Sequence, residues 1–139
     1  MAKPAVAPVR RDGGRPRPLG DPRRDLGRAG EDIATRHLAQ LGYEIVARNV
    51  RLPGGELDVV AREGDCLVFV EVRARRGRSH GTPEESITPA KQARLRLLAE
   101  AYLQALPVPP PNCRIDVVAV EFSPNGRLLR VDLYRDALA

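Results

Sequence analysis

The amino-acid sequence predicts an α/β domain with a mixed sheet of five strands flanked by helices. The helical and extended segments follow one another in the order helix, three strands, helix, two strands. Only three polar residues, 63–65, separate the second strand from the third, so these two strands must form an antiparallel hairpin. The second helix connects the third strand to the fourth, and a crossover of this kind places those two strands parallel.

The first helix is predicted over residues 26–41. Its apolar residues, among them Ile33 and Leu38, recur at helical spacing, and Gly42 stands where a helix commonly stops. The strands are short segments of loosely alternating residues, bounded by turns that contain Gly, Pro or Asn. In chain order they are predicted over residues 43–50, 56–62, 66–75, 114–122 and 127–133.

The second helix is predicted over residues 89–106, with a proline in its first turn and the proline-rich run 107–111 after its end. The preceding loop, 76–89, is polar and contains several Gly and Pro residues, and it is long enough to be mobile. The apolar side of this helix is predicted to carry Ala93, Leu97, Ala101 or Leu98, Tyr102 and Leu106.

Length and charge favour one domain with a basic tail. A chain of 139 residues, 42% of them hydrophobic, can bury one core and is short for two. We expect a disordered Arg/Pro-rich tail over residues 1–25, followed by a single domain over 26–139. The tail holds seven Lys/Arg against three Asp, so it contributes +4 of the net charge of +5. The basic charge suggests an anionic partner, either a nucleic acid or a membrane surface, unless it serves solubility alone.

Neither a signal peptide nor an apolar stretch of transmembrane length is visible, which favours a cytoplasmic protein without membrane contact. Cys66 and Cys113 have no metal-binding spacing and are too few for a disulfide framework. We expect both to be reduced thiols.

Acidic residues stand in two segments, GELDVV and VFVEVR, that otherwise resemble core strands. In an antiparallel hairpin closed by residues 63–66, the numbers of opposed residues sum to 129. Asp58 then opposes Glu71 on one face of the sheet. By the same register, Glu56 opposes Arg73. Like charges in direct opposition are destabilising, so the pair of Asp58 and Glu71 requires a cation.

Two sources of that positive charge are open. Mg²⁺ prefers hard oxygen ligands, and it would suit the carboxylates of Asp58 and Glu71 together with a backbone carbonyl such as that of Val72. Alternatively, Arg73 and nearby arginines neutralise the acids, and the site holds no metal.

The same two segments resemble the GxxD and ExK halves of the PD-(D/E)xK signature of restriction-endonuclease-like nucleases. About residues 26–135 closely resemble the YraN-type endonuclease-like family, which is similar in fold to archaeal Holliday junction resolvases. The segments that carry this resemblance are GRAGEDIATRHLAQLGYEIVARN, KQARLRLLAEAYL and CRIDVVAVEF. The resemblance implies a restriction-endonuclease-like fold and a metal-dependent endonuclease that hydrolyses DNA, including branched DNA, with Mg²⁺ or Mn²⁺ as cofactor.

Carried over position by position, the resemblance implies that Asp58 and Glu71 bind the metal. Glu31 would be a further acidic ligand or would position water, although an acid near a helix N-terminus also suits the helix dipole. Gln92 would help to organise the site, unless it is an ordinary solvated helix residue. Arg73 stands where the signature has lysine, and a guanidinium cannot act as a base but can clamp a phosphate or stabilise developing charge.

Basic residues beside the acids are candidates for phosphate contacts, which supply most non-specific affinity for nucleic acid. They lead from the third strand into the loop and resume at the start of the second helix. The predicted nucleic-acid-binding residues are Arg75, Arg76, Arg78, Lys91 and Arg94. A solvated charged loop and helix face is the simpler interpretation.

Two functions are therefore open. One is a Mg²⁺-dependent endonuclease acting on DNA, and the other is a non-catalytic nucleic-acid-binding or scaffold protein on the same fold, in which Arg73 pairs the acids permanently. A homodimer would suit a protein that acts on DNA junctions, but no exposed apolar stripe in the sequence argues for one.

Overall fold

The structure of the chain is a computed structural model that describes residues 22–77 and 87–138. Most of the predicted tail lies outside the described residues, as do Arg78 and the rest of segment 78–86. No helix in the described part of the chain is long and apolar enough to cross a membrane.

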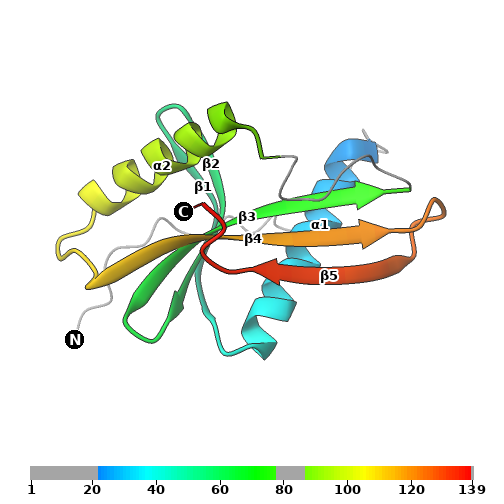
Figure 1. Cartoon of the computed structure of the whole chain (residues 1–139), viewed down its shortest axis with the longest axis horizontal. Helices are drawn as coiled ribbons and strands as arrows, with labels where there is room; N and C mark the ends of the chain where they lie inside the picture. Colours follow the sequence, from blue (N-terminus) through cyan, green and yellow to red (C-terminus); the bar gives the residue numbers. More distant parts are fainter. Residues whose placement is uncertain (1–21, 78–86, 139) are drawn as a thin grey trace, which may run out of the picture.

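The elements follow one another in the predicted order (Figure 1). They are α1 (Pro22–Gln40), β1 (Glu44–Leu52), β2 (Gly55–Glu63), β3 (Cys66–Arg76), α2 (Pro89–Gln104), β4 (Asn112–Phe122) and β5 (Leu128–Tyr134). The strands form one sheet in the order β1-β2-β3-β4-β5, in which β3 and β4 are parallel and the other neighbours antiparallel. This confirms the predicted mixed five-stranded sheet flanked by helices and is consistent with a restriction-endonuclease-like fold. The first helix begins at Pro22, four residues before its predicted start.

The first helix covers one face of the sheet. Ala34 and Leu38 are fully buried against a cluster that includes Val59, Val68 and Val118. Along β3, Val68 and Val70 belong to this cluster and Val72 packs against it, so its residues recur at every second position, as expected for side chains that point to one face. Burial of this continuous apolar surface is the main force that holds α1 on the sheet.

The second helix covers the opposite face, where Leu98 and Tyr102 pack against Phe69. The rings of Phe69 and Tyr102 meet edge to face, with centroids 5.6 Å apart. The prediction for Leu98 and Tyr102 is confirmed, but Leu97 is 66% exposed and Ala93 also faces solvent. The buried residues of α2 are Leu95, Leu98, Ala99 and Tyr102. Since α2 carries Ala or Leu on several sides, periodicity alone does not single out its buried face.

The strands β2 and β3 separate partway along their length. Their ladder runs from Glu63 opposite Cys66 to Val59 opposite Val70, so opposed numbers sum to 129 as predicted. The strongly twisted hairpin of β1 and β2 then leaves the plane of β3, β4 and β5 (Figure 1). The ladder therefore ends before it reaches the acids, and these lie where the sheet opens.

This separation changes the partner of Glu56. Glu56 is opposite Arg51 of β1, and its carboxylate lies 3.7 Å from the Arg51 guanidinium. The predicted opposition of Glu56 and Arg73 does not form in the ladder, because the register arithmetic assumed that the two strands stay paired to their ends.

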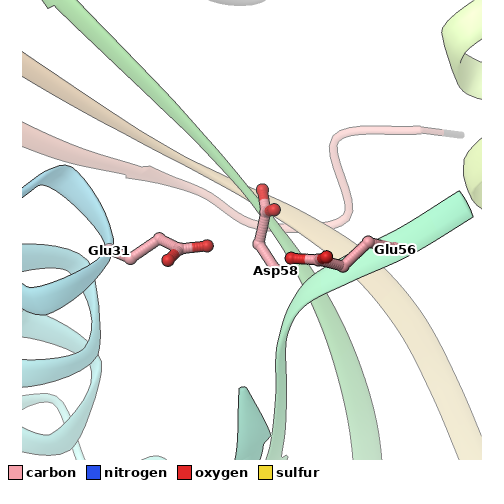
Figure 2. A group of neighbouring side chains, drawn as sticks. All are labelled: Glu31, Glu56 and Asp58. Carbon is pink, nitrogen blue, oxygen red and sulfur yellow. The ribbon is translucent and has the colours of Figure 1, made fainter. Parts of the chain in front are cut away.

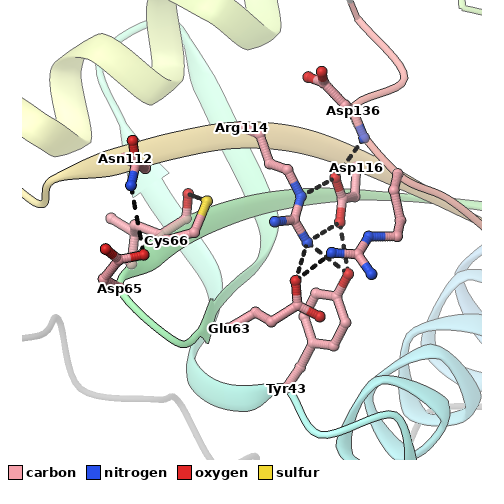
Figure 3. A network of polar contacts seen from close by, with 10 residues as sticks. Tyr43, Glu63, Asp65, Cys66, Asn112, Arg114, Asp116 and Asp136 are labelled. Carbon is pink, nitrogen blue, oxygen red and sulfur yellow. Dashed lines mark hydrogen bonds and ion pairs between the residues drawn. The ribbon is translucent and has the colours of Figure 1, made fainter.

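A buried polar network lies where β1 begins, β2 ends and β4 starts (Figure 3). The fully buried Asp116 accepts hydrogen bonds from the Arg114 guanidinium at 3.0 and 3.2 Å, and from the Tyr43 hydroxyl at 3.0 Å. The backbone N–H of Asp136 donates to the same carboxylate at 2.8 Å, and Arg114 also donates to Glu63 at 2.9 Å. The network thus joins three strands and the C-terminal segment around one buried charge pair.

Candidate active site

Acidic side chains from α1 and β2 converge at the opening between β2 and β3. Glu31 comes from the first helix, and Glu56 and Asp58 come from β2 (Figure 2). One carboxylate oxygen from each of these three residues lies within 4.8 Å of the other two. Glu31 was predicted at this site from the resemblance, whereas Glu56 was expected to be held by Arg73.

Asp58 occupies the place where β3 has lost its neighbour in the ladder. Its carboxylate accepts a hydrogen bond from the backbone N–H of Val72 at 2.9 Å. Desolvation by burial raises the pKa of Asp58, while the bonds from Val72 and from Glu71 act in the opposite direction. The side chain of Asp58 therefore accepts a backbone hydrogen bond from β3 beyond the end of the ladder, and it also faces the other acids.

Glu71 lies against Asp58, as the hairpin register predicted. Burial and the nearby Asp58 charge raise the pKa of Glu71 to about 8, although Arg73 and Lys91 act to lower it. Glu71 accordingly holds a proton at neutral pH and donates it in a hydrogen bond to Asp58. The pair is thus stabilised by this hydrogen bond and by the nearby cations Arg73 and Lys91.

Glu31 faces the same cluster from the first helix. Burial raises the pKa of Glu31 to about 7, with a further contribution from Asp58, while Arg48 and a hydrogen bond from Asn49 act to lower it. Two of the acids at this site are consequently half-protonated or more near neutral pH. Such perturbed carboxyl groups are typical of functional sites, although structural networks produce them as well.

The close approach of α1 to β3 brings Glu31 to the sheet. A Cβ atom added to Gly30 would lie 2.7 Å from the Cβ of Ala74, so only glycine fits at this point. Gly27, one turn earlier in the helix, has open space around it. The glycine directly before Glu31 therefore sets the distance between that acid and the strands.

We expect Gly30→Ala to push α1 away from β3 and to lower the free energy of unfolding by about 1–3 kcal/mol, as overpacking commonly does. Gly27→Ala is the matched control, since alanine at an open helix position should raise stability by up to about 1 kcal/mol. Urea unfolding of both variants measures the difference. Equal effects at the two positions would contradict the proposed close contact at Gly30.

Two pockets meet at the acids, one on each side of the opened sheet. Both are lined by Asp58 and Arg73. The pocket beside α1 is further lined by Leu26, Gly27, Glu31, Val72 and Ala74. The pocket beside α2 is further lined by Glu56, Glu71, Ile87, Lys91, Arg94, Leu95 and Leu98. The acids thus stand between two pockets, and the one beside α2 adds the basic residues Lys91 and Arg94.

The predicted basic residues have different positions. Lys91 and Arg94 line the pocket beside α2, next to Glu56 and Glu71. Arg75 follows Arg73 on the same face of β3, two residues further along. Arg76 instead donates to the carbonyl oxygen of Pro124 at 2.9 Å, in the turn between β4 and β5.

Gln92 stabilises the beginning of α2. Its side-chain amide donates to the carbonyl of Ile87 at 3.2 Å, and its backbone N–H donates to the carbonyl of Thr88 at 2.9 Å. The hydroxyl of Thr88 in turn caps the helix by accepting from the N–H of Lys91 at 3.2 Å. Gln92 therefore helps to fix the segment that carries Lys91 beside the acids, rather than lining either pocket formed by the described residues.

The site also contains residues that the sequence did not single out. Asn49 has a left-handed backbone with φ of 52°, and Arg48 forms an ion pair with Asp32 at 2.7 Å. Both stand in β1 beside α1. An Asn within an otherwise regular strand pattern was an available signal, because Asn adopts the left-handed conformation more readily than most residues.

Known proteins are similar in sequence to this chain over most of its length. The model of the family described as "Uncharacterised protein family UPF0102" matches residues 30–120. This chain belongs to the UPF0102 family. The match covers all four acids of the site, Glu31, Glu56, Asp58 and Glu71, and it confirms the resemblance to the YraN-type group.

Individual UPF0102 proteins are similar across nearly their full length. The UPF0102 protein of Symbiobacterium thermophilum is 55% identical over 105 residues, which cover 76% of this chain and 89% of that protein. The UPF0102 protein of Pelotomaculum thermopropionicum is 47% identical over 119 residues, covering 86% of this chain and 99% of the relative. The names of these UPF0102 proteins give the family and no activity.

Proposed function

We propose that this UPF0102 protein is a metal-dependent endonuclease that hydrolyses DNA phosphodiesters, with branched DNA among its substrates and Mg²⁺ or Mn²⁺ as cofactor. The observation that carries the proposal is the convergence of Glu31, Glu56 and Asp58 beside the pair of Asp58 and Glu71. The basic residues Lys91 and Arg94 lie directly beside these acids.

The residues fit a hard divalent cation. Mg²⁺–oxygen bonds are about 2.1 Å long, so two oxygens bound to one ion are at most about 4.2 Å apart. The carboxylate oxygens of Glu31, Glu56 and Asp58 lie within 4.8 Å of one another, and a small inward movement would bring all three into range. Asp58 and Glu71 remain the ligands expected from the sequence, and the geometry adds Glu31 and Glu56 to the candidates.

A cation at this position would lower the pKa of a bound water and polarise the phosphodiester. Glu31 would bind this cation or position the attacking water, since its carboxylate faces the other acids. Arg73 cannot act as a base but can donate to a phosphate oxygen as negative charge develops there. Lys91 and Arg94 are suited to contact phosphates of the same strand, since they line the adjoining pocket.

One observation favours a second candidate function. Arg73 lies close enough to Asp58 and Glu71 to act against the rise of both pKa values. A guanidinium is a permanent cation, so it could replace a metal in balancing these acids. The protein would then be a non-catalytic nucleic-acid-binding or scaffold protein that binds DNA without cutting it.

Thermal unfolding with and without Mn²⁺ tests the metal site. A ligand bound by the folded state alone stabilises it by about 2.7 kcal/mol at a hundredfold excess over Kd, so we expect Tm to rise by about 5 °C or more in saturating Mn²⁺. The rise should be larger at pH 8 than at pH 6. Glu31 and Glu71, with pKa values of about 7 and 8, hold protons at pH 6 that the metal must displace.

Asp58→Ala should abolish this stabilisation. Glu100→Ala, which removes an exposed acid of α2, should leave it intact. Binding to a DNA junction with no Mn²⁺-dependent rise in Tm at either pH would instead support the non-catalytic candidate.

A further inference from the structure

We propose that Asn49 is a positioning residue that gathers Glu31 and Glu56 into one ligand set before a metal arrives. This inference rests on the proposed metal site and assigns a role to a residue outside the acidic motif. Asn49 belongs to β1, so it would act on the metal only through the two carboxylates that it touches.

The backbone of β1 is interrupted at Asn49. The ladder between β1 and β2 pairs Arg48 with Val59 and Val50 with Leu57, but the position between them, Asn49 opposite Asp58, forms no ladder pair. Asn49 is left-handed, with φ of 52°. The alternation of the strand shifts here, since Ala47 and Val50 pack in the same core cluster although residues three apart in a regular strand point to opposite faces.

The shift directs the Asn49 side chain at the acids. With its nitrogen turned toward the carboxylates, the amide donates to both oxygens of Glu31 at 2.9 and 3.2 Å and to Glu56 at 2.9 Å. This orientation is assigned from the surrounding groups, because the opposite one would set the amide oxygen against acceptors. One amide group thus supplies two N–H donors to two acids that would otherwise repel each other.

The charge of the donor matters for what the site can bind. Lys or Arg at this position would hold the same two acids by neutralising them, which would remove the attraction for a metal ion. Asn49 offers hydrogen bonds without a net charge, so it reduces the cost of bringing Glu31 and Glu56 together and leaves their negative charge available.

Arg48, the residue before Asn49, forms a second contact between β1 and α1. The Arg48 guanidinium binds the Asp32 carboxylate at 2.7 Å, so two consecutive residues of β1 contact the consecutive residues Glu31 and Asp32 of α1. Arg48 also acts to lower the pKa of Glu31. These two contacts fix the position of α1 relative to β1 so that Glu31 lies close to Glu56.

The variant Asn49→Gly removes the side-chain contacts of Asn49 and keeps its backbone conformation. Glycine adopts the left-handed conformation freely, and Asn49 is exposed, so the variant should keep the fold. Calorimetric titration should show the Kd for Mn²⁺ rising about tenfold, as is common when a residue that orients metal ligands is removed. An unchanged Kd in this variant would overturn the proposed role of Asn49.

A double-mutant cycle with Glu56→Gln gives the sharper test. If Asn49 acts by joining Glu31 to Glu56, the effect of Asn49→Gly on Kd should fall to less than about threefold once Glu56 is neutral. An equal tenfold effect in both backgrounds would show that Asn49 acts otherwise and would overturn the inference. Wild-type protein that binds no Mn²⁺ would remove the proposed metal site and this inference together, whereas the other two adverse results would remove only the role of Asn49.

Discussion

Asp58→Ala is expected to abolish metal-dependent DNA cleavage, lowering the rate by about a thousandfold or more. Asp58 is shared by both pockets and belongs to both acid groups, the pair with Glu71 and the cluster with Glu31 and Glu56. Its removal therefore affects each arrangement that could hold a metal. The measurement is cleavage of a labelled four-way junction, a flap and a linear duplex of matched sequence in Mg²⁺ or Mn²⁺.

Asp58→Asn serves as the isosteric control for folding. Its amide oxygen can still accept the bond from Val72, so Tm should stay near that of the wild type while cleavage is lost. Glu100→Ala should cleave normally. Cleavage that survives Asp58→Ala, at the wild-type rate and with the same metal requirement, would rule out the proposed site.

Asp116→Ala is expected to lower the free energy of unfolding by about 3–5 kcal/mol, because it leaves a partly buried guanidinium without its main acceptor. Asp116 is completely buried and accepts from Arg114, the Tyr43 hydroxyl and the backbone N–H of Asp136. Because this position is completely buried, water cannot replace the lost hydrogen bonds in the variant. Urea unfolding measures the loss from the transition midpoint.

Asp132→Ala is the matched control for the buried network. Asp132 forms an ion pair with Arg130 at the surface of β5, and both side chains are substantially exposed. Exposed pairs contribute at most about 1 kcal/mol, so this variant should unfold nearly like the wild type. A similar small loss for Asp116→Ala would mean that the network does not hold the strands together.

Local sequence signals were sufficient for the topology. The short polar segment 63–65 forces β2 and β3 into a hairpin and fixes its register, and a helical crossover makes β3 and β4 parallel. The buried face of α2 could not be read in this way. Leu97 and Leu98 are equally apolar, and only packing against Phe69 decides which of them is covered.

The same contrast applies to the site. Asp58 and Glu71 are close to the tight turn at residues 64–65 and only one position past the last ladder pair, Val59 opposite Val70, so register arithmetic still places them near each other. Glu56 and Asn49 are further from that turn, beyond the point where the strands part, and their positions depend on the bend in β1 and on the contact of Gly30 with Ala74. Long-range packing of this kind leaves no spacing rule in a single sequence.

The interruption of β1 at Asn49 also bears on self-association. β1 forms one edge of the sheet, and the free N–H and C=O groups of an edge strand can pair with a strand from another molecule. A left-handed residue and the register shift between Ile45 and Ala47 break the regular row of these groups within a few residues. The irregularity that turns an amide toward the acids therefore also makes this edge a poorer template for a strand from another molecule.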